Sequence, residues 1–170
     1  MQTAGYYPNR REFIRDVTLL ASGGRDGAVR LWDPETGQQR SVLKGHKGWV
    51  SAMCTVTLPG GTTLLAAGGS DQTVRLWDPA TGEQQAILEG HSAWVRALCA
   101  VTVPGGTILL ASGSDDRTVR LWDPRIGQKR GVLRNREEVR AVCPVTLPRG
   151  TTLVATGGRD GTVRLWDPAG

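Results

Sequence analysis

The hexapeptide VRLWDP occurs four times in this chain, at residues 29–34, 74–79, 119–124 and 163–168. Its tryptophans are Trp32, Trp77, Trp122 and Trp166, which lie 45, 45 and 44 residues apart. Self-similarity at a period of about 40–50 residues is typical of proteins in which each repeat forms one small unit of secondary structure. The sequence therefore predicts four successive units built on one plan.

Each period has the same order of apolar segments and turns. In the third period an apolar stretch at 95–101 leads to the turn Pro104-Gly105-Gly106, and a second apolar stretch follows at 107–112. A tight polar turn comes before the VRLWD segment, and a fourth short segment follows it, as at 84–88 in the second period. Val, Ile, Thr and Trp dominate the segments, while Pro and Gly set the turns. The pattern predicts a four-stranded antiparallel meander for each unit.

Polar residues recur at fixed points of these units. Gly45-His46 and Gly90-His91 precede the first segment, Asp71 and Asp116 stand in the tight turn, and Trp-Asp follows in every copy. With these motifs the sequence resembles the WD-repeat β-propeller family over residues 17–170. The resemblance implies an all-β fold: a β-propeller built from four-stranded antiparallel blades, with about four blades in this chain.

Both ends of the chain depart from the repeat. Residues 1–16 do not match the other copies, and we expect this divergent segment to complete a blade. Residues 17–170 are expected to hold the four blades, the last of which lacks its outer strand in cis. Three arrangements stay open, because end blades expose apolar faces: two chains joined in an eight-bladed ring, a piece of a longer propeller protein, or four blades alone.

The family resemblance also implies a buried tetrad of His, Ser or Thr, Asp and Trp in each blade. One blade has the full set. The second blade has Ala67 in place of the hydroxyl, the fourth has Arg136 in place of the His, and the first has no His. The expected tetrad residues are His91, Ser112, Asp116 and Trp122 in the complete blade, and His46, Asp71, Trp77, Ser22, Asp26, Trp32, Thr156, Asp160 and Trp166 in the others.

The same residues do not indicate an enzyme. Ser112, His91 and Asp116 are a hydrolase triad in composition only, because their spacing follows the blade repeat and no Gly-x-Ser-x-Gly elbow is present. The chain has two His, one in each of two blades, and no His or Cys cluster at metal-ligand spacing. We therefore expect no catalysis, no metal and no cofactor.

A partner is expected at the blade end that carries the His loop and the tight turn, since loops on a rigid scaffold commonly bind partners. Trp and Arg, both enriched in interface hot spots, gather there. Glu138, Ser51, Ser70 and Asp115 occupy equivalent positions in other blades. The expected partner-binding residues are Trp49, Trp94, Arg96, Arg140, Arg25 and Arg159. We expect a non-catalytic scaffold for a protein or peptide with acidic and apolar residues; the alternatives are a structural module that completes a ring and Arg-mediated binding of a polyanion.

Composition narrows the remaining classes. The net charge is +5, but no run of Lys or Arg marks a basic patch, so nucleic acid is not the expected partner. Cys54, Cys99 and Cys143 share one repeat position, and we expect them to be buried, unpaired and in the reducing cytoplasm. No apolar run is long enough to span a membrane.

Overall fold

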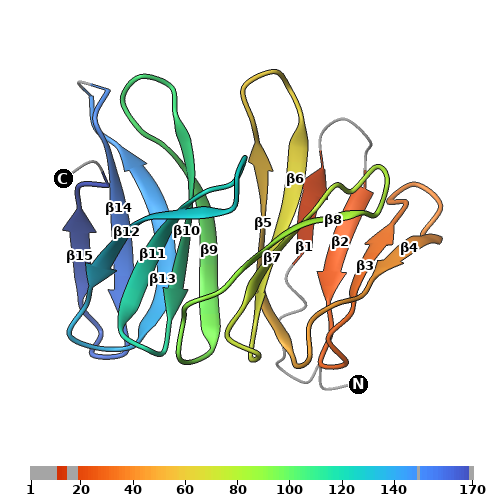
Figure 1. The fold of residues 1–170 in the computed structure, drawn as a ribbon, viewed down its shortest axis with the longest axis horizontal. Helices are drawn as coiled ribbons and strands as arrows, with labels where there is room; N and C mark the ends of the chain where they lie inside the picture. The colour runs from red at the N-terminus through yellow and green to blue at the C-terminus, as the bar shows by residue number, and fades with distance from the viewer. Residues whose placement is uncertain (1–10, 15–18, 149, 169–170) are drawn as a thin grey trace, which may run out of the picture.

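The computed structural model of the chain describes residues 11–14, 19–148 and 150–168, with side chains from residue 19 onward. Within these ranges every regular element is a β-strand, and the strands form four antiparallel sheets that stand side by side (Figure 1). The expected all-β fold of four-stranded antiparallel blades is confirmed. No helix in the described part of the chain is long and apolar enough to cross a membrane.

Each sheet corresponds to one sequence unit, and we number these blades 1 to 4. Blade 1 holds β1 (Arg11–Ile14), β2 (Leu19–Gly23), β3 (Val29–Trp32) and β4 (Gln39–Leu43). Blade 2 holds β5 (Val50–Thr57), β6 (Thr63–Gly69), β7 (Val74–Trp77) and β8 (Gln84–Leu88). Blade 3 holds β9 (Val95–Thr102), β10 (Ile108–Ser114), β11 (Thr118–Asp123) and β12 (Gln128–Arg134). Blade 4 holds β13 (Val139–Thr146), β14 (Thr152–Gly158) and β15 (Val163–Trp166).

The order of strands within each blade is the meander that the turns predict. Sequence neighbours pair throughout, as β5-β6-β7-β8 in blade 2, with β13-β14-β15 in blade 4. Of residues 1–16, only β1 is described, and it pairs with β2. In the tight turns Gln72 and Arg117 adopt φ of 68° and 67°, at the place that Gly27 and Gly161 occupy in blades 1 and 4. In each of the four turns, one residue with a left-handed backbone conformation thus closes the turn.

The hydrophobic core lies between blades rather than within one. Val74 and Leu76 of β7 are fully buried against blade 3, where they join a cluster with Val95, Leu110 and Trp122. The same relation links blade 1 to blade 2 and blade 3 to blade 4. Because each sheet buries its face only against a neighbour, the stability of one blade depends on the next.

The two end blades present unequal surroundings to equivalent residues. Blades 1 and 4 lie at opposite ends of the row of sheets (Figure 1). Val119 and Leu121 of blade 3 are 0% and 2% exposed, whereas Val163 and Leu165, their counterparts in blade 4, are 73% and 56% exposed. The outer face of β15 therefore carries an apolar surface that no described blade covers.

One expectation about the cysteines is wrong. Cys54 and Cys99 are buried, but Cys143 is exposed, because it belongs to blade 4, where no described blade lies beyond its inner strand. Burial, with a smaller contribution from the neighbouring Cys143, raises the pKa of Cys99 to about 12. Its thiol is thus protonated and unreactive at neutral pH.

Candidate functional site

In blade 3 the four tetrad residues form one chain of hydrogen bonds. The Trp122 indole Nε1 donates to Ser112 Oγ at 2.8 Å, and Ser112 Oγ lies 2.8 Å from His91 Nε2. His91 Nδ1 lies 2.7 Å from Asp116 Oδ2. A neutral imidazole with its proton on Nδ1 satisfies every member: the indole donates, the hydroxyl accepts and donates, and the carboxylate accepts.

Asp116 ends this chain at the tight turn. Its burial alone would raise its pKa, but hydrogen bonds from His91, from the Thr118 hydroxyl and from the Ser92 amide outweigh that effect and hold the pKa well below its usual range. Ser112 is 0% exposed. A hydroxyl that no substrate can reach, and that already bonds two neighbours, is a structural group rather than a nucleophile.

Blade 2 keeps the His–Asp pair but lacks the hydroxyl. His46 Nδ1 lies 2.9 Å from Asp71 Oδ1, and its Nε2 lies 3.2 Å from the carbonyl oxygen of Ala67. A neutral imidazole has one N–H, so it cannot donate to both acceptors. Burial, opposed by the hydrogen bond to Asp71, lowers the pKa of His46 below its ordinary value.

Blades 1 and 4 keep the hydroxyl–indole half. Trp32 Nε1 donates to Ser22 Oγ at 2.7 Å, and Trp166 Nε1 donates to Thr156 Oγ1 at 3.0 Å. In these blades the tight-turn carboxylate binds the Arg of its own VRLW segment. The pairs are Arg30 with Asp26 at 2.5 Å and Arg164 with Asp160 at 2.9 Å.

The assignment of Arg136 to the His position in blade 4 is wrong. His46 and His91 each lie four residues before the first Val of their inner strand, and the residue four before Val139 is Asn135. Asn135 is 9% exposed, whereas Arg136 is exposed. The Nδ2 of Asn135 is buried without a hydrogen-bond partner. The shorter Asn side chain thus enters the position but does not complete the tetrad.

The predicted partner-binding residues lie in one continuous row at the blade end that carries the tight turns, the lower end in Figure 1. The guanidinium of Arg25, in blade 1, stacks over the Trp49 ring of blade 2 at 4.3 Å from its centroid. Trp49 meets Trp94 of blade 3 edge to face, with ring centroids 5.5 Å apart. Arg96 in turn stacks over Trp94 at 4.3 Å. Three blades are therefore joined by cation–π and aromatic contacts.

Ion pairs carry the row onward into blade 4. Arg96 binds the Asp115 carboxylate at 2.7 Å, and Arg140 lies 3.4 Å from the other oxygen of Asp115. Glu138 then bridges Arg140 and Arg159, the latter at 3.2 Å. The linking carboxylates, Asp115 and Glu138, occupy positions equivalent to the predicted ones. No sequence signal showed that Asp115 would join blades 3 and 4 or that Glu138 would join two Arg side chains of blade 4.

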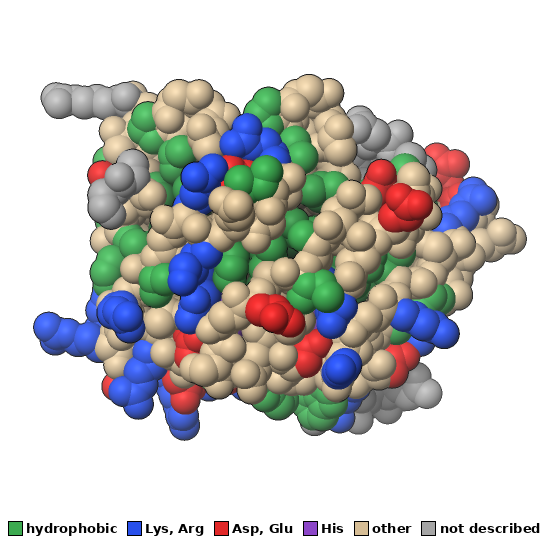
Figure 2. Space-filling view, viewed as in Figure 1, with side chains coloured by type: hydrophobic (Ala, Val, Ile, Leu, Met, Phe, Trp, Pro, Cys, Tyr) green, Lys and Arg blue, Asp and Glu red, His purple; other side chains and the backbone are tan. Residues whose placement is uncertain are grey.

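We refer to these eight residues as the Trp/Arg row: Arg25, Trp49, Trp94, Arg96, Asp115, Arg140, Glu138 and Arg159. The row holds four guanidinium groups against two carboxylates, so it has an excess of positive charge. Trp49 is 42% exposed, which is high for a large aromatic residue. Figure 2 shows Lys and Arg side chains with carboxylates among them at the lower left of this end, and hydrophobic side chains further along the same edge.

The described residues contain no cluster of three or more His, Cys, Asp or Glu side chains that could hold a metal ion. The complete tetrad of blade 3 is largely buried, while the Trp/Arg row is accessible and continuous. A surface with an exposed Trp ring, a second half-buried Trp ring and stacked guanidinium groups is suited to recognition.

The chain matches the family model WD40, described as WD domain, G-beta repeat, at residues 6–33, 37–78, 82–123 and 127–167. These matches cover most of the sequence, and the protein belongs to the WD40 repeat family. The match at 37–78 contains β4 of blade 1 and the first three strands of blade 2. The repeats at 37–78, 82–123 and 127–167 therefore each link two neighbouring blades.

Individual relatives match over about one repeat. A stretch of 46 residues, 26% of this chain, is 48% identical to the sterol regulatory element-binding protein cleavage-activating protein of Xenopus laevis, of which it covers 4%. A stretch of 46 residues, 27% of this chain, is 50% identical to nuclear distribution protein PAC1 of Coprinopsis cinerea, of which it covers 10%. Nuclear distribution protein nudF 1 of Talaromyces marneffei is 43% identical over 42 residues, which are 25% of this chain and 9% of that protein. The match spans a tenth or less of these relatives' lengths.

Proposed function

We propose that the Trp/Arg row is the surface through which this WD40-repeat protein binds a peptide or protein, and that the bound segment presents acidic and apolar side chains. The observation that carries the proposal is the continuity of the row across four blades. WD40 repeats generally serve protein–protein interaction and not catalysis, and this supports a non-catalytic scaffold.

The chemistry of the row decides the kind of partner. Trp49 and Trp94 offer flat apolar area, and the guanidinium groups offer planar donors that match a carboxylate. Arg159 has a side chain that is 68% exposed, so it can bind a partner without loss of much internal packing. The excess of guanidinium over carboxylate favours an acidic segment and disfavours a basic one.

Selection of peptides from a random library on the immobilised full chain tests this function. The expected result is enrichment of sequences with Asp or Glu beside an aromatic or aliphatic residue. The double variant Trp94→Ala/Arg96→Ala should weaken binding of the selected peptides by about 2 kcal/mol or more, because hot-spot residues contribute that much. Thermal denaturation of the variant should give a midpoint close to that of the wild type.

Arg40→Ala is the matched control. Arg40 is a 59% exposed Arg that pairs with Asp33 at the other end of blade 1, so its loss should leave peptide binding intact. Retention of every selected peptide by the double variant would show that the row is not the site. Capture of nucleic acid with a steep salt dependence, in place of peptides, would favour the polyanion alternative.

Self-association is a second proposed function, and the exposed face of β15 supports it. Val163 and Leu165 are exposed, with no described blade against them. At the other end of the row of blades, Leu20 and Trp32 are only half buried. Their counterparts in blades 2 and 3, which include Leu65, Leu110 and Trp122, are buried. The two end faces are thus the two halves of the contact that joins neighbouring blades. A second copy of the chain supplies both, which gives an eight-bladed ring.

Light scattering tests the ring. The expected mass is near twice the 18.2 kDa of one chain, and Leu165→Glu should return the mass to that of one chain. A wild-type chain that stays monomeric at high concentration would refute the dimer. We also propose the cytoplasm as the location, because Cys99 and Cys143 are free thiols and a reducing compartment keeps them so.

A further inference from the structure

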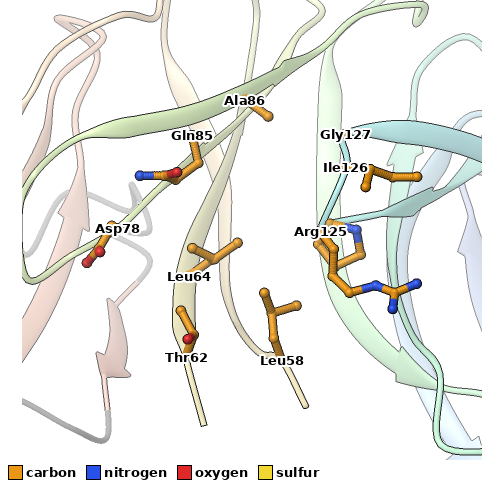
Figure 3. Close-up of a pocket in the computed structure, with 10 residues that line it drawn as sticks. Leu58, Thr62, Leu64, Asp78, Gln85, Ala86, Arg125, Ile126 and Gly127 are labelled. Carbon is orange, nitrogen blue, oxygen red and sulfur yellow. The ribbon is translucent and has the colours of Figure 1, made fainter. Parts of the chain in front are cut away.

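A groove of about 300 Å³ lies between blades 2 and 3 (Figure 3). Leu58, Leu64 and Ala86 of blade 2 form one part of its lining, and Ile126 of blade 3 faces them. Because adjacent strands are antiparallel, the loops after β5 and β7 lie at the strand ends opposite the tight turns. The groove is therefore separate from the Trp/Arg row.

The residue that faces the groove from blade 3 is a departure from the repeat. The loops after β3, β7 and β11 are closed in the same way. The backbone N–H of Gly37, Gly82 or Gly127 donates to the carbonyl of the Asp four residues earlier, at 2.8 to 2.9 Å. In two copies the residue before this Gly is Thr36 or Thr81, whose hydroxyl accepts a backbone N–H. The sequence letters DPRIG put Ile126 there instead.

This substitution has no benefit within the described chain. Ile126 cannot accept the backbone hydrogen bond, and its side chain is 55% exposed. Its partner across the groove also departs: Ala86 stands where Ser41 and Gly131 stand opposite the third-strand Leu of the other blades. Because an apolar residue stands on each side, the groove between blades 2 and 3 is suited to an apolar group.

The charges at the rim are also specific to this groove. Asp33 pairs with Arg40 and Asp123 pairs with Arg130, each Arg lying seven residues after its Asp. The equivalent residue for Asp78 is Gln85, which is neutral. Among the described residues no cation forms a salt bridge with Asp78, so its carboxylate lies at the groove without a counter-charge.

The opposite rim is positive. Arg125 and Arg130 both bind the buried Asp123 carboxylate at 2.8 Å, so two guanidinium groups share one negative charge. Arg125 is 52% exposed at its side chain and lies across the groove from Asp78 (Figure 3). A carboxylate at one side, an apolar centre and a guanidinium at the other side suit a segment with an apolar side chain between opposite charges.

We propose that this groove binds a peptide segment with a large apolar side chain that has a Lys or Arg on one side of it and an acidic residue on the other. The apolar side chain lies between Leu64 and Ile126, its basic neighbour pairs with Asp78, and the acidic residue meets Arg125. The protein then holds two partners at once, one at each end of its blades.

Capped peptides with the sequences Gly-Lys-Phe-Glu-Gly, Gly-Glu-Phe-Glu-Gly and Gly-Lys-Gly-Glu-Gly, titrated into the isotopically labelled full chain and followed by amide chemical shifts, test the proposal. The first peptide should shift amides around Leu58, Ala86 and Ile126. The peptide without Lys and the peptide without Phe should bind about tenfold more weakly or not at all.

Two variants restore the residues of the other blades, so both should fold. Ile126→Thr should lower the affinity for the first peptide about tenfold, through loss of apolar contact. Gln85→Arg should abolish the preference for Lys over Glu beside the Phe, because the Arg neutralises Asp78. The Trp94→Ala/Arg96→Ala variant should bind this peptide as the wild type does, which separates this site from the proposed function of the row.

Three results would overturn the proposal: equal binding of the first peptide and the peptide without Lys, unchanged affinity of Ile126→Thr, or peptide-induced shifts confined to the Trp/Arg row. The last result would show that the peptide recognises the row alone.

Discussion

Arg164 Nη2 binds Asp160 Oδ2, the tight-turn carboxylate of blade 4, at 2.9 Å. In blade 3 the equivalent carboxylate, Asp116, binds His91 instead. In blade 2, where His46 binds Asp71, the Arg of the VRLW segment binds elsewhere: Arg75 donates to Gln84 at 2.7 Å. The carboxylate thus keeps a positive or donating partner in all four blades, and two residue types serve the same position.

Ser112→Ala should destabilise the protein by about 1–3 kcal/mol, because it leaves both the Trp122 indole and His91 Nε2 without their buried partner. Chemical denaturation measures this loss. Ser92→Ala removes an exposed hydroxyl nearby and is the control, with an expected change within about 0.5 kcal/mol. An unchanged stability of Ser112→Ala would contradict a structural role for the tetrad.

Ala67→Ser should stabilise blade 2 by up to about 1 kcal/mol. The new hydroxyl takes the place that Ser112 has in blade 3, where it can donate to His46 Nε2 and accept from the Trp77 indole. At present the unprotonated His46 Nε2 faces the carbonyl oxygen of Ala67, which is also an acceptor. In the variant this nitrogen has the hydroxyl as its donor. A thermal midpoint below that of the wild type would show that the buried position has no room for the hydroxyl.

Asn135→His should complete a tetrad in blade 4. Thr156 already accepts the Trp166 indole, and Asp160 lies in the tight turn, so the imidazole meets both a hydroxyl and a carboxylate. It also removes the buried Nδ2 of Asn135 that has no partner. We expect a gain of about 1 kcal/mol in the free energy of unfolding, measured in urea. Arg136→His, at the neighbouring exposed residue, is the control and should give no gain.

Stability should fall as the pH is lowered through the ordinary pKa of histidine. Burial, opposed by Asp71, holds the pKa of folded His46 below the ordinary histidine value of 6.5, so the unfolded chain binds a proton that the folded chain does not. The contribution is fully present above pH 6.5 and is lost progressively below it, down to the lower folded pKa. Urea midpoints across this range measure the slope, and His46→Gln should reduce it. An equal slope in this variant would assign the effect to another group.

The candidate surface was predicted residue by residue but not as a connected structure. Trp49, Trp94 and Arg96 follow from their places beside the first Val of each blade. Their stacking, and the bridge through Asp115, depend on how far neighbouring blades are rotated, which a local pattern does not contain. The groove at Ile126 was not predicted at all, although the change from Thr to Ile in the repeated loop was visible as a signal.

The sequence by itself determined the repeated unit of this protein: four copies of a strand meander, their turns, and the Trp and Asp of each copy. These depend on short-range alternation of apolar residues and on turn residues with restricted φ, which are local properties. Tertiary structure alone decided which side chain meets each tight-turn carboxylate. It also decided that Asn135 enters the His position and that Val163 stays exposed. The first two outcomes depend on contacts within a blade between residues as far apart in sequence as His91 and Asp116, which are 25 residues apart. The third depends on whether a neighbouring blade covers β15.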